Sequence, residues 1–281
     1  MLVQNLLRED APLAPNEWNS IDQAVVNTAK ERLVCRRFIS VFGPLGAGVQ
    51  AICQDIFAGV DAGQMSLLGE EDIHPVHAET RSFKPIPIIY KDFVIHWRDI
   101  ETSHTISVPI DTSAAAGAAS FVAEAEDNLI LNGSEALGLE GLVNAKWRNT
   151  VPMLNWDEPG QAFQNAVNAT ERLIGEGFYG PFAMVISPAM YAKMQRVYNN
   201  TGVLEINQVR EIVEAGVFRT PVLPDNTGIV VSTGAENFDI AVAQDLITAY
   251  LGPKDMSHPF RVLEALVLRI KRPQAICTFE P

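Results

Sequence analysis

Apolar residues recur three and four positions apart near the start of the chain, which is the spacing of one face of an α-helix. The stretch opens at Pro15 and has five such positions: Trp18, Ile21, Val25, Ala29 and Leu33. It leads to Arg36 and Arg37, and cations suit the C-terminal end of a helix because they offset its dipole. We therefore predict a helix over residues 15–37.

Three more helices follow from capping residues and periodicity. Asp111, Thr112 and Ser113 form an N-cap cluster for an alanine-rich helix over residues 114–131. Residues 161–174 repeat the helical spacing. Ser187 followed by Pro188 predicts another helix start, because proline suits the first helical position. The apolar side of this last helix is expected to run from Met190 to Tyr198.

Alternating apolar and polar residues predict strands, above all over residues 88–100, where Phe93, Ile95 and Trp97 share one face. Short apolar runs predict further strands over residues 38–42, 182–186, 228–232, 240–250 and 260–271. The coarse result is an α+β chain without a flexible linker between independent domains.

Residues 55–110 differ from the rest because glycine and proline punctuate them and residues 70–72 are all acidic. We interpret them as a long, mostly extended arm with few residues that could form a core. Such an arm is awkward in a monomer. A neighbouring subunit is therefore the natural surface for it to pack on.

Composition narrows the classes of function. The formal net charge is −13, which disfavours wrapping of nucleic acid, since phosphate binding needs clustered lysine and arginine. Residues 1–15 lack the pattern of a signal peptide, and no apolar run reaches the ~18 residues of a membrane span. Cys35, Cys53 and Cys277 form no C-x-x-C pair, so we expect buried free thiols in a cytoplasmic protein.

Motifs for catalysis and cofactor binding are missing: the sequence has no G-x-S-x-G, P-loop or H-E-x-x-H. The glycine-rich residues 43–48 favour a turn. His74 and His77 beside three acidic residues could bind a divalent cation weakly, but Pro75 between them favours a solvated acidic loop. Trp97 could stack on a planar ligand, although packing is the favoured interpretation. We predict no enzyme, no metal site and no catalytic residues.

Several segments stand in a characteristic order along nearly the whole chain: residues 11–18, 36–39, 85–93, 97–101, 124–127, 138–142, 180–182, 230–234, 244–246 and 258–265. Together they resemble the encapsulins, bacterial nanocompartment shell proteins with the fold of tailed-phage capsid proteins. In detail the sequence looks most similar to the iron-storage encapsulins.

The resemblance implies an α+β, phage-capsid-like (HK97-type) fold. Its peripheral domain would comprise residues 1–54, 108–143 and 224–281, its extended loop residues 55–107, and its axial domain residues 144–223. In the family, axial domains meet at fivefold vertices. A pore there would be lined by five consecutive residues: Tyr198, Asn199, Asn200, Thr201 and Gly202.

The resemblance also implies a docking site for a C-terminal peptide of a cargo protein, between the first helix and a strand. The helix side would be Val25, Ala29, Leu33 and Arg36, and the strand side Ile240, Ala241 and Val242. An apolar stripe that ends in a cation suits a peptide with a few apolar anchors. The same stripe could instead pack into the core, and the sequence leaves both interpretations open.

The function implied is that of a self-assembling icosahedral shell of about 60 or more copies of this chain. Its expected contents are ferritin-like, iron-mineralising cargo, for iron storage and protection from oxidative stress. The shell itself would hold no cofactor, with iron held by the cargo, and would bind neither nucleic acid nor membrane. The alternatives are a phage or prophage major capsid protein and a shell around a dye-decolourising peroxidase. The acidic charge and the lack of a preceding scaffolding segment disfavour the phage.

Overall fold

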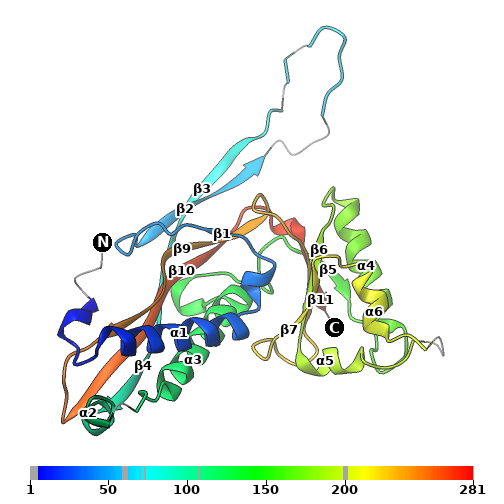
Figure 1. Cartoon of the computed structure of the whole chain (residues 1–281). Coiled ribbons are helices and arrows are strands. Elements are labelled where there is room, and N and C mark those ends of the chain that lie inside the picture. Colours follow the sequence, from blue (N-terminus) through cyan, green and yellow to red (C-terminus); the bar gives the residue numbers. More distant parts are fainter. Residues whose placement is uncertain are drawn as a thin grey trace.

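The computed structural model describes residues 6–58, 63–69, 71–72, 74–106, 108–198 and 202–280. Two lobes lie side by side and a two-stranded arm extends away from them (Figure 1). The arm consists of β2 (Ala51–Ala58) and β3 (His77–Pro85), paired antiparallel. The side chains of Met65, Leu67 and Leu68 near its tip are almost fully exposed. An extended arm was predicted, but its pairing as a hairpin was not.

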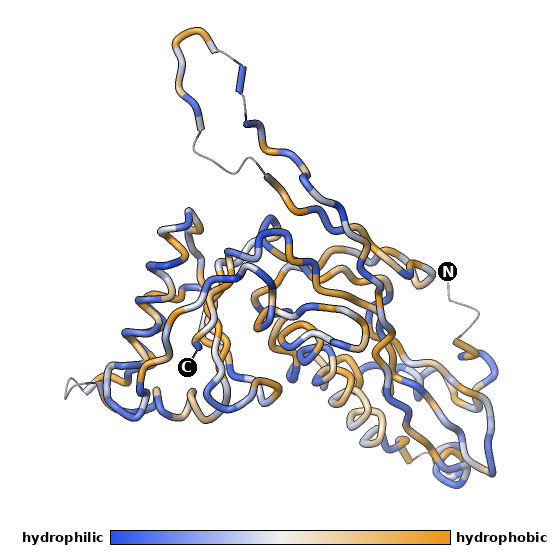
Figure 2. The backbone as a smooth tube through the Cα atoms, turned by 180° about the vertical axis from the view of Figure 1, so that it is seen from behind, coloured by the Kyte–Doolittle hydropathy of each residue, from blue (hydrophilic) through white to orange (hydrophobic). Residues whose placement is uncertain are grey.

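The first lobe is built on a four-stranded sheet in the order β1-β9-β10-β4. Its strands are β1 (Val41–Phe42), β4 (Ile88–His96), β9 (Phe238–Tyr250) and β10 (Ser257–Ile270). Three helices belong to this lobe: α1 (Pro15–Arg32), α2 (Trp97–Ile106) and α3 (Ser113–Asn132). α1 and α3 pack on one face of the sheet, where Trp18, Phe93 and Phe260 meet in a common core. Figure 2 shows the sheet from the side opposite these helices.

The second lobe has a five-stranded sheet in the order β5-β11-β8-β6-β7. Its strands are β5 (Asn149–Pro152), β6 (Phe182–Ile186), β7 (Gly216–Arg219), β8 (Gly228–Ser232) and β11 (Ile276–Glu280). Its helices are α4 (Gln161–Gly175), α5 (Pro188–Lys193) and α6 (Glu205–Arg210). β8 and β11, which the resemblance assigned to the peripheral domain, thus pair with strands from the segment 144–223.

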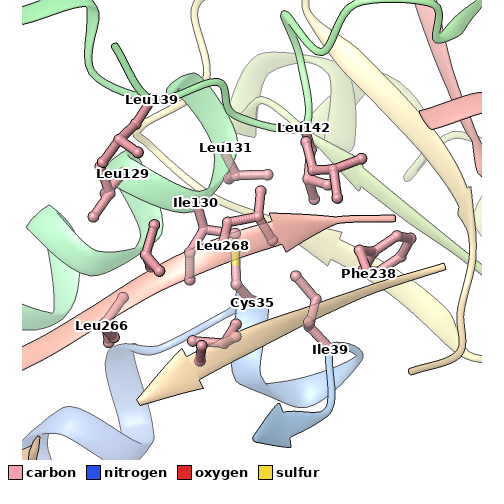
Figure 3. Close-up of a cluster of buried hydrophobic side chains, with 14 of the residues drawn as sticks. Cys35, Ile39, Leu129, Ile130, Leu131, Leu139, Leu142, Phe238, Leu266 and Leu268 are labelled. Atoms are coloured by element: carbon pink, nitrogen blue, oxygen red, sulfur yellow. The ribbon is translucent and has the colours of Figure 1, made fainter. Parts of the chain in front are cut away.

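A hydrophobic core joins the two lobes (Figure 3). In β6 the alternate residues Ala183 and Val185 face this joint core, whereas Phe182, Met184 and Ile186 face the core of the second lobe. Both faces of the strand are therefore buried, which explains its continuous apolar run. Four short 3₁₀ segments complete the description: η2 (Arg8–Asp10), η3 (Cys35–Arg37), η4 (Glu135–Leu137) and η5 (Pro273–Ala275).

The predicted helices over residues 114–131 and 161–174 and the strands over residues 182–186, 228–232, 240–250 and 260–271 are confirmed to within a few residues. Ser187 is also confirmed as an N-cap, accepting the backbone N–H of Met190. The structure adds elements that were not predicted: α2, α6, β5, β7 and β11.

The predicted end of the first helix was wrong, because α1 stops at Arg32. The buried carboxylate of Asp127, on α3, accepts the backbone N–H groups of Val34 and Cys35 at 2.9 Å each. These N–H groups therefore do not make the backbone hydrogen bonds that would continue the helix, and the chain passes into η3. The strand predicted over residues 38–42 shrinks to β1, since Phe38 and Ile39 pack into the joint core instead.

Three further predictions were wrong. The strand over residues 88–100 ends at His96, because Trp97 begins α2 and its N–H bonds to the carbonyl of Met256. Trp97 therefore does not share the face of Phe93 and Ile95. The helix after Ser187 stops at Lys193, because the start of α6 donates backbone N–H groups to the carbonyls that follow α5. Cys53 is exposed on the arm, unlike Cys35 and Cys277.

Candidate functional site

Two adjoining cavities lie between α1 and β9. One, of about 330 Å³, is lined by Val26, Ala29, Lys30, Leu33, Arg36, Arg37, Asp245 and Leu246. The other, of about 370 Å³, is lined by Arg8, Asp22, Val25, Val26, Leu246, Ile247 and Thr248. Because they share Val26 and Leu246, we treat them as one groove, called here the α1–β9 groove.

The groove exists because β9 is longer than the strand beside it. β1 pairs with β9 only at Ile240 and Ala241, and no strand of the described chain continues that pairing beyond them. Further along β9, the N–H of Leu246 bonds to the carboxylate of Asp245 and the carbonyl of Thr248 accepts from Arg8. Side chains thus replace a neighbouring strand. This leaves an open sheet edge below α1, which is a typical receptor for an extended peptide.

A cluster of charged side chains around Arg36 lies at one end of this groove. Arg36 donates to both carboxylate oxygens of Glu126, at 2.7 and 2.8 Å, to Glu264 at 2.9 Å and to Asp245 at 2.8 Å. Glu126 and Glu264 are fully buried, whereas Asp245 is exposed at the rim. The cluster therefore ties the end of α1 to α3 and to both long strands.

Glu264 reaches this cluster through an irregularity in the sheet. The pairing of β10 with β9 shifts in register between Leu263 and Ala265, so Glu264 has no partner in register on β9. Burial and the nearby carboxylate of Glu126 raise the pKa of Glu264 well above its ordinary value. Burial also raises the pKa of Glu126, while its bonds to Arg36 act in the opposite direction. Among the carboxyl groups of the cluster, Glu264 therefore has the strongest tendency to keep its proton.

The residues expected on the helix side all lie along the groove. Ala29, Leu33 and Arg36 line the first cavity and Val25 lines the second. Val25, Ala29 and Leu33 are nevertheless almost fully buried against α3 and its neighbours. The same residues therefore pack into the core and also line the groove. Val26, which lies off the stripe and is partly exposed, completes the helix wall and was missed.

The residues expected on the strand side lie elsewhere. Ile240, Ala241 and Val242 are buried in the joint core. The strand wall of the groove is instead formed by four residues further along β9: Asp245, Leu246, Ile247 and Thr248. The shortness of β1 and the shifted register of β9 against β10 set this position, and neither leaves a signal in the sequence.

Of the residues expected to line a pore, Tyr198 and Gly202 are described, and Asn199, Asn200 and Thr201 lie outside the described residues. The N–H of Tyr198 bonds to the carbonyl of Val203 at 2.8 Å. Nearby, Arg196 bonds to the buried carboxylate of Glu205 and to the carbonyl of Trp156.

Comparison with known proteins identifies the family to which the chain belongs. A family model described as "Encapsulating protein for peroxidase" matches residues 3–267. The type 1 encapsulin shell protein EncA of Myxococcus xanthus is 50% identical over 269 residues, covering 96% of this chain and 94% of that protein. The chain belongs to the encapsulin family of shell proteins.

Other similarities extend this result. A diheme-cytochrome–encapsulin shell fusion protein of Kuenenia stuttgartiensis is 44% identical, covering 94% of this chain and 72% of that protein. The crystal structure of a virus-like particle from Pyrococcus furiosus matches with a TM-score of 0.76 at 22% identity, covering 94% and 99% of the two chains. The capsid of Myoviridae phage XM1 matches at 0.61 and 11% identity, covering 86% and 88%. The α+β phage-capsid fold is thereby established, and the family match favours an encapsulin over a phage capsid protein.

The described part of this encapsulin shows no group of three histidine, cysteine, aspartate or glutamate residues placed to hold a metal ion. His74 and His77 are exposed on the arm, and the Nδ1 atom of His77 lies 2.9 Å from the carbonyl oxygen of Pro75. Within the same residues, no helix is long and apolar enough to cross a membrane. Encapsulins are known as structural shell proteins.

Proposed function

We propose that this encapsulin encloses cargo proteins, each held on the inner wall by a C-terminal peptide that docks in the α1–β9 groove. The observation that carries this proposal is the open edge of β9 below α1, lined by apolar side chains and closed by charged residues at both ends. Main-chain groups of the edge would bind the peptide backbone, which requires that the side chains of Asp245 and Arg8 release the N–H of Leu246 and the carbonyl of Thr248. The apolar walls at Val26, Leu33 and Leu246 would take its anchor side chains.

Leu33→Asp tests the groove because it places a charge against the peptide. Since Leu33 is almost fully buried, Val26→Asp on the exposed part of the same wall is the second variant, in which the new charge stays outside the subunit core. The expected result is loss of co-purifying cargo from particles of normal size. Asn27→Asp is a matched control for one added negative charge on α1, since Asn27 is exposed and lines neither cavity of the groove. If cargo loading is unchanged in Leu33→Asp, the groove is not the docking site.

We propose ferritin-like, iron-mineralising cargo for this shell, serving iron storage and protection from oxidative stress. Support comes from a relative in Pyrococcus furiosus, a ferritin-like–encapsulin shell fusion protein, 29% identical over 73% of this chain and 55% of that protein. Iron would be the content of the cargo, with no cofactor in the shell. The description of the family model favours a peroxidase as the second candidate. Mass spectrometry of co-purified protein distinguishes ferritin-like cargo from a peroxidase. Shells that contain ferritin-like cargo but form no electron-dense cores after iron loading would contradict the iron-storage proposal.

We further propose an icosahedral particle of about 60 or more copies, located in the cytoplasm. The arm formed by β2 and β3 would lie over a neighbour, which its exposed apolar tip supports, whereas β4 and α2 of the expected loop 55–107 belong to the first lobe. Residues 144–223 together with β8 and β11 would form the axial domain around a fivefold pore at Tyr198–Gly202, and residues 1–54, 108–143 and the remainder of 224–281 the peripheral domain. The free thiols of Cys35 and Cys277, buried and unpaired, suit a reducing compartment.

A further inference from the structure

The side chain of Arg8 crosses the α1–β9 groove at the end opposite Arg36. Its Nη1 atom donates to the carbonyl of Thr248 at 3.0 Å and to Oδ1 of Asp22 at 3.1 Å, and its Nη2 atom donates to Oδ2 of Asp22. The guanidinium carbon lies 3.9 Å from the centre of the Trp18 ring. A bidentate carboxylate, a carbonyl and an aromatic face together recognise a planar guanidinium.

Two of the three receptor groups line the groove, Asp22 on α1 and Thr248 on β9, and Trp18 lies on α1 one turn before Asp22. The hydroxyl of Thr248 and the indole Nε1 of Trp18 are also buried there without a hydrogen-bond partner among the described residues. Buried polar groups normally find partners. This end of the groove therefore has polar groups to offer beyond those that Arg8 uses.

The segment that supplies Arg8 is weakly attached. η2 is a single 3₁₀ turn without a side-chain cap, and Leu7 before it has a left-handed backbone (φ 48°) and an exposed side chain. The Asp22 side chain is 38% exposed, so the ion pair is open to solvent on one side. Arg36 differs, because two of its three carboxylate partners are fully buried. Arg8 can thus leave its site at a much smaller cost than Arg36.

We propose that Asp22, Trp18 and the Thr248 carbonyl form a guanidinium site at this end of the cargo groove, occupied by Arg8 in the free subunit and taken over by an arginine side chain of a docking peptide. The proposal rests on the docking function proposed above. The site selects guanidinium over ammonium, because only a planar fork meets both oxygens of Asp22 while stacking on Trp18.

The test uses assembled particles of Arg8→Ala and the probe N-acetyl-leucyl-arginine amide, with its citrulline counterpart as the uncharged isostere. Calorimetry is expected to show saturable binding of the arginine probe and about tenfold or more weaker binding of the citrulline probe, as loss of a charged hydrogen bond implies. Adding Asp22→Asn should abolish this preference. Wild-type particles should bind the arginine probe more weakly than Arg8→Ala, because Arg8 competes for the site.

Equal binding of the two probes, a preference that survives Asp22→Asn, or equal binding by wild-type and Arg8→Ala particles would each overturn the proposal. Arg8→Met, which keeps an apolar stem over Trp18, replaces Arg8→Ala if the latter does not assemble. Arg98→Ala is the matched control, since Arg98 lies over Trp97 without an ion pair in the described chain, and these particles should bind both probes as the wild type does. Leu33→Asp separates the two proposals. If this variant loses cargo while the arginine and citrulline probes bind equally well to Arg8→Ala particles, the docking groove is supported and only the guanidinium site is contradicted.

Discussion

Arg36 and Glu126 face each other through two parallel hydrogen bonds of 2.7 and 2.8 Å, and this pair joins η3, the short segment after α1, to α3. The carboxylate is fully buried and the guanidinium is mostly so. Although burial opposes charge on Arg36, its bonds to Glu126 raise the pKa of Arg36, so the cation persists at every accessible pH. The groove is therefore built around a permanent positive charge.

Arg36→Ala should destabilise the subunit by about 3–5 kcal/mol, because it leaves Glu126 and Glu264 buried without a cation. Thermal unfolding of assembled particles measures the loss as a lower Tm. Arg37→Ala is the control, since Arg37 donates only to the backbone carbonyl of Glu31. A Tm for Arg36→Ala equal to that of Arg37→Ala would show that the cluster contributes little to the fold.

The stability of wild-type particles should fall as the pH rises above the ordinary carboxyl pKa and through the raised pKa of Glu264. The unfolded chain binds this proton only below a pKa of about 4.3, whereas the folded chain retains it to a higher pH. Its stabilising contribution is therefore complete at low pH and is lost when Glu264 ionises. Glu264→Gln, which cannot ionise, should reduce this dependence in a series of melting curves. Parallel curves for the two proteins would contradict the assignment of the proton.

Gly133→Ala should impair folding, whereas Gly138→Ala should cost only about 1–2 kcal/mol. Both glycines have positive φ angles, which disfavour any residue with a Cβ atom by that amount. A Cβ atom at Gly133 would also lie 2.3 Å from the carbonyl oxygen of Leu139, while Gly138 faces open space. The yield of soluble protein and its Tm compare the two variants. Equal values would mean that the turn after α3 relaxes freely.

The sequence predicts a helix, a strand or a site residue well where the interactions that determine it lie within the same short segment of the chain. α3 and β6 were predicted because capping residues, alanine content and apolar runs act within each segment. The end of α1 was not, because Asp127 reaches it from 93 positions away along the chain. The helix wall of the groove follows from the stripe at Val25, Ala29 and Leu33. The strand wall depends on where β1 stops and where β10 shifts register, which only the assembled sheet decides.

The pair Leu67→Asp and Leu68→Asp at the tip of the arm should block assembly without unfolding the subunit. These side chains are almost fully exposed in the single chain, so the substitutions cost the subunit little. Burial against a neighbour would make the same charges strongly unfavourable. Size-exclusion chromatography should give small oligomers, with circular dichroism unchanged from that of the wild type. Particles formed at wild-type yield would show that the tip is not part of a subunit contact.

The most direct test of a shell built from copies of this one chain is electron microscopy of the purified wild-type protein, without cargo or nucleic acid. Closed hollow particles of uniform size, tens of nanometres wide, are expected, with the arm of each subunit resting on its neighbour. A monomer or small oligomer at all protein concentrations would contradict it.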